Sequence, residues 1–494
     1  MKEQYEYLSL REALLRKGEE VNFYGAVSEY QHPMPTRGSD FICTMSVVDM
    51  SHDKTGLRLL IFASPANCPL VKSIGDIIRV HRVEMGDYRG APQAIAKINR
   101  KSSYILFQGK NGQGYDPYQK AHNTFSFEQH DERRLDIMRN WIESHPLYTR
   151  VSDYLVRICG ITDGSYFDLC CKILYVEERS PELSTIIYVW DGTDATPRTI
   201  STVGPDVDGE DFDLEATVVN GYPQSMLPRH VVCDFPPLGT VLPIIPDIQL
   251  DDLPGQLPQC GDWVKFRNLA CRSRSRVLEA AFTRESKISL LSKDNQLVKN
   301  CESHYAGRIL SEQGRLPQSC LQPPQLLQSL TVTDYEHVRF STLREVLAHP
   351  EVTSKFRCLV RVMSTCPSAV ADFCDPSTKK GKNATTEDSN SQFAYAVRLT
   401  LEDPTARLHS YLHGEDGAKF FNGHPPADLH VDSSIVGAFE RKVHKLLGVR
   451  LSEETGLPTV RDPPWIKCCI KSYYTDKSNP WKSRCFRIFG TRYI

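Results

Sequence analysis

A strand that ends in aspartate recurs along this chain, and it constrains the fold more than any other feature of the sequence. The runs Val47 to Asp49 and Val189 to Asp191 each close a segment rich in β-branched and aromatic residues, and a turn and a new strand follow each. A second mark also recurs, because Gly75-Asp76 and Gly261-Asp262 each open a strand of alternating apolar and basic residues. Recurrence of both marks predicts structural repeats.

The first repeat is predicted to be a small closed β-barrel. Five short strands are expected with one helix before the fourth, and two further helices are expected at the ends of the unit. The expected strands lie at residues 21–27, 41–48, 57–63, 76–83 and 93–98, and the expected helices at 8–16, 66–73 and 132–144.

The remaining chain divides at changes in composition. The second repeat carries an insertion near 194–260 that is rich in Asp, Glu and Pro, and we interpret it as a solvated acidic loop. Gln, Pro and Ser dominate residues 311–330, a predicted linker. A third unit after it repeats the strand, acidic turn, strand, helix and strand order, with its helix at 435–447. The predicted domains are therefore 1–145, 146–310 and 331–494.

Overall charge limits the classes of function. The 494 residues hold 59 Lys and Arg against 61 Asp and Glu, which argues against a globally basic nucleic-acid binder, so any such surface must be local. No apolar run approaches the roughly 18–20 residues that span a bilayer, and the amino terminus is too charged for a secretory signal. We therefore expect a soluble protein inside the cell.

Three segments of the first unit combine aromatic, cationic and short polar side chains. One is the turn that runs from Thr36 to Phe41, the next is the strand that carries Phe62, and the third ends at Tyr88-Arg89, after His81. An unpaired nucleic-acid strand needs rings for its bases and cations for its phosphates, so this conjunction indicates single-strand binding. Each ring taken alone could equally be a core residue.

The second unit repeats the pattern more weakly. Alternation places Tyr166 and Asp168 on one face of a strand, so Tyr166 can serve as a stacking platform. A dense group of cations follows Gly261-Asp262, and we interpret it as a track for phosphates, although a solvated charged face is the simpler alternative. These cations are Lys265, Arg267, Arg272 and Arg274.

Enzyme and metal signatures were sought as well. The sequence holds no HExxH, GxSxG or kinase motif, and its cysteines lack zinc-finger spacing: Cys170-Cys171 and Cys468-Cys469 are adjacent. We therefore expect no catalytic residue, no metal and no cofactor.

With these residues laid out, the chain resembles the protection of telomeres family, and most closely its plant branch. The quoted segments of the first unit carry the likeness, together with Tyr24 to Val27, Leu60 to Phe62 and Gly75 to Arg82. Tyr166 to Leu169 and Val189 to Thr193 carry it in the second unit. The resemblance implies a mainly β chain of three OB-folds, five-stranded Greek-key barrels in tandem with short helices. The first two would bind single-stranded G-rich telomeric DNA and the third would bind protein.

The family's DNA-contacting positions can be carried over one by one. The resemblance implies that Phe62 and Tyr88 stack on bases, that Asp40 and Gln93 contact guanine edges, and that Arg37 and Arg89 hold backbone or base. Ser39 and Tyr166 also match contact positions, and Phe235 is a candidate stacking position of the second fold. The predicted DNA-binding set is Arg37, Ser39, Asp40, Phe41, Phe62, His81, Tyr88, Arg89, Gln93, Tyr166, Phe235, Lys265, Arg267, Arg272 and Arg274.

Two functions therefore stay open. The first is a non-enzymatic binder that protects the 3′ overhang in the nucleus, at telomeres, or regulates telomerase. The second is a scaffold of the telomerase particle whose OB-folds contact protein or RNA more than DNA. An OB-fold ligase or synthetase is a weaker third, because no catalytic domain fits the remaining chain. The turn after Cys366 lacks the residue types found at Arg37 to Asp40, so we expect the third unit to bind telomerase or other telomere proteins. The closing segment from Trp481 to Phe489 is basic and aromatic, which leaves a nucleic-acid role there as the alternative.

Overall fold

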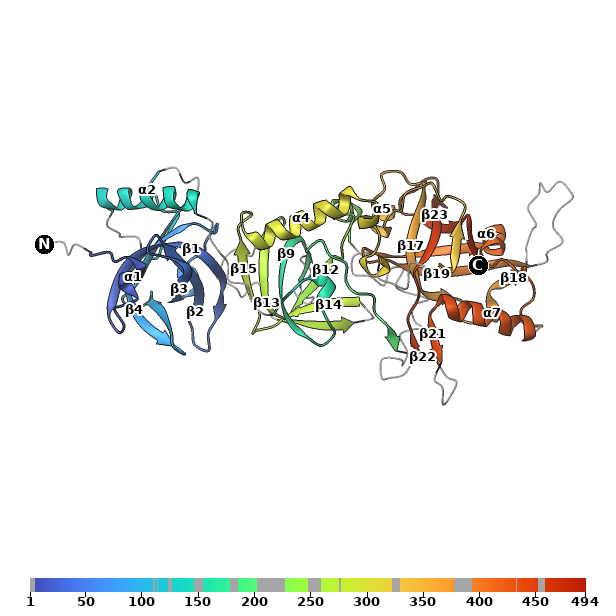
Figure 1. Cartoon of the computed structure of the whole chain (residues 1–494), viewed down its shortest axis with the longest axis horizontal. Helices are drawn as coiled ribbons and strands as arrows, with labels where there is room; N and C mark the ends of the chain where they lie inside the picture. The colour runs from blue at the N-terminus through green and yellow to red at the C-terminus, as the bar shows by residue number, and fades with distance from the viewer. Residues whose placement is uncertain are drawn as a thin grey trace. The chain divides into compact units, whose positions relative to one another are not determined.

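The computed structural model shows a mainly β chain that divides into two compact units (Figure 1). The first unit holds residues 1–191, 242–273 and 278–303, and the second holds 192–241, 274–277 and 304–494. The structure describes residues 5–109, 112, 114–122, 127–145, 154–177, 185–201, 227–247, 259–274, 277–321, 329–376, 393–431, 433–451 and 458–494.

Five strands of the first unit close into a barrel. Strand β1 pairs with β2 and β4, β3 pairs with β2 and β5, and β4 pairs with β5, so the strand order around the barrel is 1-2-3-5-4-1. The β3–β5 pair is parallel and the other four are antiparallel. The bounds are β1 Glu20–Pro35, β2 Phe41–Asp49, β3 His52–Ala63, β4 Ile77–Tyr88 and β5 Ala91–Lys97.

The same unit contains a second barrel with the same order. It runs β9-β10-β12-β14-β13 and closes through the β13–β9 pair, with β12 and β14 parallel. In both barrels an extra strand, β6 or β15, lies beside the fourth barrel strand, and a helix, α2 or α4, follows. The bounds are β6 Ser103–Phe107, α2 Gln129–Ser144, β9 Tyr166–Glu177, β10 Ile186–Trp190, β12 Leu242–Pro246, β13 Trp263–Arg274, β14 Val277–Phe282, β15 Lys287–Leu291 and α4 Gln296–Leu310.

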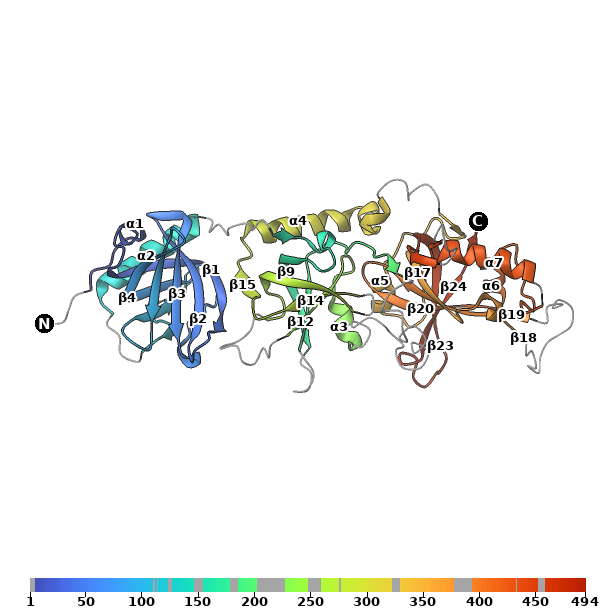
Figure 2. The same cartoon turned by 90° about the horizontal axis from the view of Figure 1, so that it is seen from below.

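The second unit contains a barrel of the same kind. It runs β17-β19-β20-β24-β23 and closes through the β17–β23 pair, with β20 and β24 parallel. Helices α6 and α7 follow β20, and both views show α7 beside this barrel (Figures 1 and 2). The bounds are α5 Leu343–Ala348, β17 Lys355–Cys366, β19 Phe393–Glu402, β20 Arg407–His413, α6 Gly414–Phe420, α7 Ser433–Leu446, β23 Ile466–Tyr474 and β24 Arg484–Phe489.

Shorter elements complete the described chain. They are α1 Leu10–Ala13, β7 Gln119–Lys120, β8 Leu155–Val156, β11 Ile200–Ser201, α3 Arg229–Asp234, β16 Thr331–Thr333, β18 Cys374–Pro376, β21 Val449–Leu451, β22 Pro458–Arg461 and β25 Thr491–Tyr493, besides several single 3₁₀ turns.

The recurring aspartate of the sequence holds the start of each barrel in place. Asp49 is 6% exposed, and its Oδ2 accepts the backbone N–H of Leu10, the first residue of α1, at 2.8 Å. Its Oδ1 accepts the backbone N–H groups of Ser51 and His52 and the Ser51 hydroxyl at 2.6–2.9 Å. One carboxylate therefore satisfies a helix start and the turn into β3, which would otherwise carry unpaired donors.

The other two barrels repeat this contact. Asp403, at the end of β19, accepts the backbone N–H of Leu343 at 2.7 Å and the backbone N–H and hydroxyl of Thr405 at 2.8 and 2.6 Å. In the second barrel Asp191 accepts the N–H of Ile158, the first residue of a 3₁₀ turn, at 2.8 Å. The repeat read from the sequence is thus a capping carboxylate at the end of the second barrel strand.

The Gly-Asp repeat is also structural. Gly75 has φ +99° and donates its N–H to the Val27 carbonyl at 2.8 Å, while Gly261 has φ +95° and donates to Ile173 at 2.8 Å. In each copy the carbonyl of the next aspartate accepts a bond from that same partner, at 2.8 and 2.9 Å. A left-handed residue is required here to turn the chain into the fourth strand, which explains the glycine.

The fold prediction is confirmed in its main terms: the chain is mainly β, with five-stranded OB-type barrels and few helices. The helix expected at 66–73 is wrong, because the structure has one 3₁₀ turn at Pro65–Asn67 and then irregular chain with bends. Pro69 explains this difference, since proline disfavours helix for itself and for the residue before it.

Some predictions fall on segments that are not described. The acidic residues of the insertion at 206–213 and at 251–252 lie outside the described residues, as does most of the polar stretch 375–391. Part of the predicted linker 311–330 is described, and there Cys320 is buried against Leu359 and Trp465. The domain boundaries themselves stay a prediction.

Candidate nucleic-acid interface

One outer face of the first barrel spans β2, β3 and β5. Leu57, Leu59, Ile61 and Ala63 of β3 are buried in the core, so the residues between them point away from it. Strand register aligns the outward residues into rows: Ile42 with Phe62 and Lys97, then Thr44 with Leu60 and Ile95, then Ser46 with Arg58 and Gln93.

Phe62 and Gln93 therefore share this face, as predicted site residues should. Phe62 is half-buried, and Gln93 is 8% exposed. Lys97 forms an ion pair with Glu84 of β4 at 3.9 Å, and both side chains are more than two-fifths exposed. Such an exposed ion pair contributes little to stability, so Lys97 can exchange Glu84 for an anionic ligand at low cost.

The turn between β1 and β2 borders the face and is internally bonded. The Thr36 hydroxyl donates to the Asp40 carbonyl at 2.6 Å and accepts the Gly38 N–H at 3.2 Å. The Asn99 amide donates to Asp40 Oδ1 at 2.8 Å, which ties the turn to the end of β5. The predicted residues Arg37 and Ser39 are exposed on this turn, and Phe41 is half-buried after it.

The turn between β4 and β5 presents an aromatic ring and a cation. Tyr88 is 52% exposed, and the Arg89 guanidinium lies 5.4 Å from the centre of its ring. Arg89 and Gly90 have φ values of +53° and +81°, as in a two-residue hairpin turn, and Asp87 Oδ1 accepts the Gly90 N–H at 2.9 Å. Tyr88 is thus held on a rigid turn, as a stacking platform requires.

His81 is not brought to this face. Its ring is 7% exposed, stacks on Tyr5 at 4.1 Å and shares a hydrogen bond of 2.8 Å with the Tyr7 hydroxyl. Burial, together with the charges of Arg79 and Arg82, lowers the pKa of His81 to about 4. A histidine that stays neutral and buried offers no charge to a phosphate, so the structure favours a core role.

The second barrel presents fewer of its predicted residues. Tyr166 is 64% exposed, while the next residue, Phe167, is buried, which follows the predicted alternation. Arg267 is exposed, with its Nε 3.7 Å from Asp168 Oδ2, whereas Lys265 is 5% exposed and burial lowers its pKa. Tyr166 and Arg267 are therefore the accessible pair of this barrel.

For two other predicted cations, the structure does not show side chains that are free to bind phosphates. Arg272 is half-exposed and donates to both carboxylate oxygens of Asp247 at 2.8 and 2.6 Å. This bidentate pair is already satisfied, so a phosphate must compete with Asp247. Arg274 ends β13, and its side chain lies outside the described residues.

Phe235 is placed differently from the other predicted residues. It follows α3 in the second unit, is 4% exposed, and lies 5.0 Å from the guanidinium of Arg344. A ring this buried has no face open to a base. The resemblance had suggested Phe235 as a stacking position, but the long insertion around it makes the alignment of this segment with the family ambiguous.

A family model described as "Telomeric single stranded DNA binding POT1/CDC13" matches residues 1–152, and one described as "POT1A-like, OB fold domain" matches residues 326–479. "Protection of telomeres protein 1a" of Arabidopsis thaliana is 30% identical over 500 residues, which cover 99% of this chain and 98% of that protein. The chain belongs to the protection of telomeres family.

Other members match over shorter lengths. "Protection of telomeres protein 1" of Homo sapiens is 30% identical over 182 residues, or 36% of this chain and 27% of that protein. The crystal structure of fission yeast Pot1 with single-stranded DNA covers 61% of this chain and 93% of that chain at 14% identity, with a TM-score of 0.25. That score is too low to support a residue-level comparison.

Within this family member, sequence reasoning missed two cations of the first two barrels. Arg58 lies two rows from Phe62 on the same outward face, and alternation along β3 could have identified it. Lys287 of β15 pairs in register with Arg267, and burial together with the charges of Arg58 and Arg267 lowers its pKa. Nothing in the local sequence around Lys287 indicates that neighbourhood, which arises from packing within the first unit.

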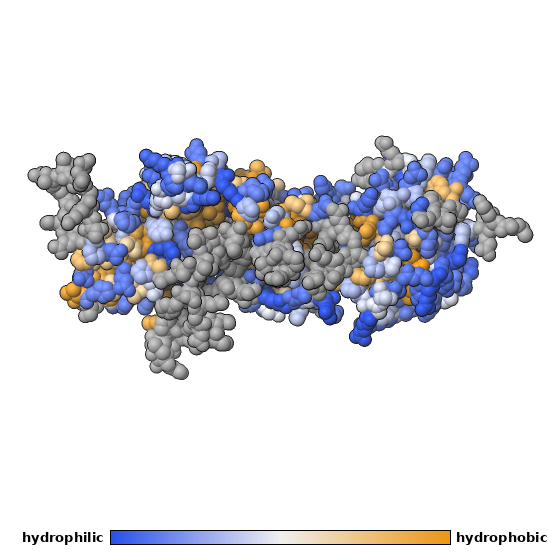
Figure 3. All heavy atoms as spheres, turned by 180° about the vertical axis from the view of Figure 1, so that it is seen from behind, coloured by the Kyte–Doolittle hydropathy of each residue, from blue (hydrophilic) through white to orange (hydrophobic). Residues whose placement is uncertain are grey.

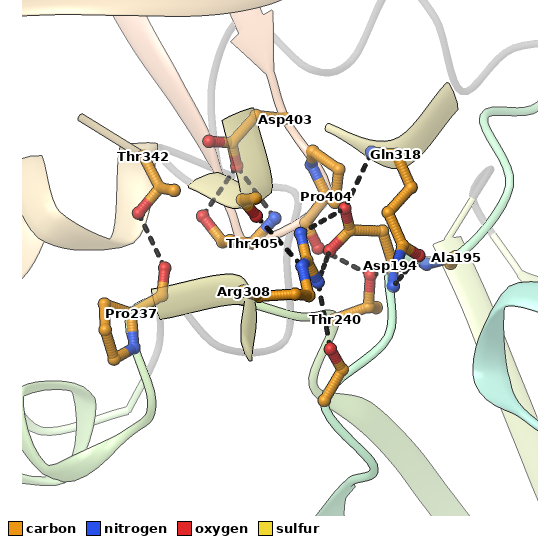
Figure 4. Close-up of polar contacts among 12 residues, drawn as sticks. Asp194, Ala195, Pro237, Thr240, Arg308, Gln318, Thr342, Asp403, Pro404 and Thr405 are labelled. Carbon is orange, nitrogen blue, oxygen red and sulfur yellow. Dashed lines mark hydrogen bonds and ion pairs between the residues drawn. The ribbon is translucent and has the colours of Figure 1, made fainter. Parts of the chain in front are cut away.

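The second unit also contains a buried cluster of polar side chains, centred on Arg308 and Asp194 (Figure 4). Arg308 donates to both carboxylate oxygens of Asp194 at 2.9 and 2.8 Å, and the Gln318 N–H donates to the same carboxylate at 3.0 Å. Thr240 donates to the Pro404 carbonyl at 2.7 Å. These groups satisfy one another, so the cluster has a structural role.

Among the residues that the structure describes, no three His, Cys, Asp or Glu side chains are placed to hold a metal ion. Within the same residues, no helix is long and apolar enough to cross a membrane.

Proposed function

We propose that this protein binds single-stranded G-rich telomeric DNA at chromosome ends, in the nucleus, and thereby protects the 3′ overhang or regulates telomerase. The observation that supports this most is the outer face of the first barrel. Its central strands and two adjoining turns carry Phe62, Gln93, Asp40 and Tyr88, and OB-folds bind oligonucleotides at that face and those turns.

Each residue of this face suits a different part of an unpaired strand. Phe62 and Tyr88 would stack on bases, a contact worth about 1–3 kcal/mol per base. Asp40 and Gln93 would accept the N–H groups of guanine edges, which explains a preference for G-rich sequence. Arg37 and Arg89 are exposed and would hold phosphates.

The second barrel would bind a further part of the same DNA strand. Tyr166 offers an exposed ring and Arg267 an exposed cation, and both lie on strands that pair with each other, β9 and β13. Arg272 would contribute less, because Asp247 already neutralises it. We assign DNA binding to residues 1–145 and 146–310, without any catalytic step.

The domain at 331–494 would dock telomere proteins such as telomerase subunits. Ile435, in the first turn of α7, is 43% exposed, and Val431, two residues before the helix, is 79% exposed. Figure 3 shows apolar areas broken up by hydrophilic ones on the face that it draws. A helix with exposed apolar side chains is a common docking element, which supports this part of the proposal.

The test is direct binding of the full chain to three ligands of one length: the G-rich strand, its complement and their duplex. We expect the G-rich strand to bind most tightly, because stacking needs unpaired bases and the polar contacts read guanine. Equal affinity for all three would refute the proposal. If the protein bound every nucleic acid weakly but still co-purified with telomerase, the scaffold function would be favoured instead.

A further inference from the structure

Strand register aligns five residues of the third barrel across its outer surface. Lys355 of β17 is opposite Lys471 of β23, which is opposite Arg487 of β24. Arg487 is opposite Tyr411 of β20, and Tyr411 is opposite Arg398 of β19. We call these five residues the cationic row.

The row faces away from the core. Lys355 and Arg487 are exposed, Tyr411 is 40% exposed, and Lys471 and Arg398 are half-buried. Their neighbours along the strands, including Ile470, Ile488 and Leu412, are each buried in the core cluster of this barrel, which fixes the direction of the row.

Four cations on adjacent strands cost stability. Like charges directly opposite each other in a sheet are destabilising, and here two such pairs adjoin, Lys355 with Lys471 and Lys471 with Arg487. Asp416 lies 3.6 Å from Arg487 Nε and offsets part of this repulsion. An arrangement that the fold does not need, and that weakens it, indicates an anionic ligand.

Arg398 supports the same conclusion. Its Nε is buried and has no hydrogen-bond partner among the described residues. Buried side-chain donors are normally bonded, so an unpaired N–H on this row is an exception that a ligand oxygen reaching it would satisfy. It lies one strand from Tyr411, on the same row as the exposed ring.

Three residues of the row, Arg398, Tyr411 and Arg487, lie on strands equivalent to those of the proposed interface of the first barrel, while Lys355 and Lys471 lie on the first and fourth strands. β19, β20 and β24 are its second, third and fifth strands, as β2, β3 and β5 are in the first barrel. Tyr411 stands on the third strand, as Phe62 does. We propose that the cationic row is a second binding surface for an unpaired DNA strand, with Tyr411 stacked on a base and the cations on the adjoining phosphates.

This inference goes beyond the proposed function, in which the third domain binds protein alone. An unpaired DNA strand suits the row better than an acidic peptide does. Both could pair with the cations, but only the DNA strand also has bases that can stack on the exposed ring of Tyr411. The docking helix α7 remains free for a protein partner, because the row contains no residue of α7.

The test is site-specific photo-crosslinking in the full chain. A benzoylphenylalanine in place of Tyr411 should crosslink to a G-rich single strand, whereas the same probe in place of Tyr474 should not. Tyr474 is a matched control, because it is 37% exposed on β23 and outside the row.

Affinity gives a second measurement. In a chain that carries Phe62→Ala and Tyr88→Ala to weaken the first barrel, Tyr411→Ala should lower the remaining affinity about 5- to 150-fold, the range for one stacked base. Lys471→Ala with Arg487→Ala should reduce the slope of log affinity against log salt by about 1.4. Neither change should lower the melting temperature. Lys471→Ala with Arg487→Ala relieves the repulsion between the cations, and Tyr411→Ala leaves that repulsion unchanged.

The outcomes are distinct from those of the proposed function. Loss of binding in Phe62→Ala alone tests the first barrel, while crosslinking at position 411 tests the row. No crosslink at 411, equal crosslinks at 411 and 474, or a stronger crosslink to RNA of the same sequence or to an acidic peptide would each overturn the assignment to DNA.

Discussion

The first and third barrels share a frame and differ in what the frame presents. Both have the strand order 1-2-3-5-4-1, and both hold their first helix with a buried aspartate, Asp49 or Asp403. Their outer faces differ, because the first aligns Ile42 with Phe62 and Lys97 while the third surrounds Tyr411 with cations.

This difference shows which residue positions are constrained by folding and which are available for ligand binding. Inward residues and the capping aspartate are fixed by packing and by backbone hydrogen bonds, so both barrels keep them. Outward residues on the second, third and fifth strands touch solvent, so each barrel can match them to a ligand. The comparison predicts similar effects of core changes and different effects of surface changes.

The largest effect is expected at the capping aspartates. Asp49→Ala and Asp403→Ala should each lower the unfolding free energy of their barrel by about 3 kcal/mol or more, because each leaves several buried N–H groups unbonded. Thermal melts of the full chain would measure this. Asp53→Ala, at an exposed position near the start of β3, is the control and should change little. A large loss in one barrel alone would contradict the shared role.

The two barrels should respond to pH in opposite directions. His81 has a pKa of about 4 instead of 6.5, so the unfolded chain binds more protons between these values, and the first barrel loses up to about 3 kcal/mol as pH falls through this window. Burial raises the pKa of Asp403 to about 6 from 3.8, so the native third barrel binds more protons there and loses up to about 3 kcal/mol as pH rises through its window.

Urea unfolding at several pH values would check this. Trp141 on α2 reports on the first barrel and Trp465 on the third. His81→Gln should flatten the pH dependence seen at Trp141, and Asp403→Asn should flatten that at Trp465. Parallel pH profiles at both reporters in the unaltered protein would contradict the opposite signs.

A smaller effect is expected at the two rings that are proposed to stack on DNA bases. Phe62→Ala or Tyr88→Ala should weaken binding of a short G-rich oligonucleotide by about 1–3 kcal/mol, measured by fluorescence anisotropy. Leu15→Ala removes an exposed apolar side chain of the same barrel and should leave affinity unchanged. If the two aromatic variants fold and bind as the unaltered chain does, the rings do not stack on bases.

The smallest effect is expected at Arg272. Because Asp247 occupies its guanidinium, Arg272→Ala should reduce the salt slope by no more than about 0.7. Asp247→Asn should free the arginine and strengthen binding by less than about 1 kcal/mol. Affinities at a series of salt concentrations would show both changes, and a loss of guanine preference in either variant would mean that Arg272 reads bases.

The sequence by itself determined the repeated frame of this protein. The marks at Asp49, Asp191, Gly75 and Gly261 recur in the sequence, and each proved to make backbone hydrogen bonds that the repeats share. Their partners lie far away along the chain, so the repetition made these residues recognisable in a single sequence. Alternation also separated exposed Tyr166 from buried Phe167, a distinction that depends only on neighbours in the chain.

Only the tertiary structure decided which side chains meet. His81 and Phe235 looked like surface residues, but packing against Tyr5, Tyr7 and Arg344 buried them. The cationic row brings together residues from five separate strands and more than a hundred positions of chain, which no local pattern indicates. Strand register across a closed barrel sets such contacts, because it is fixed by the pairing of whole strands and not by the residues of any one of them.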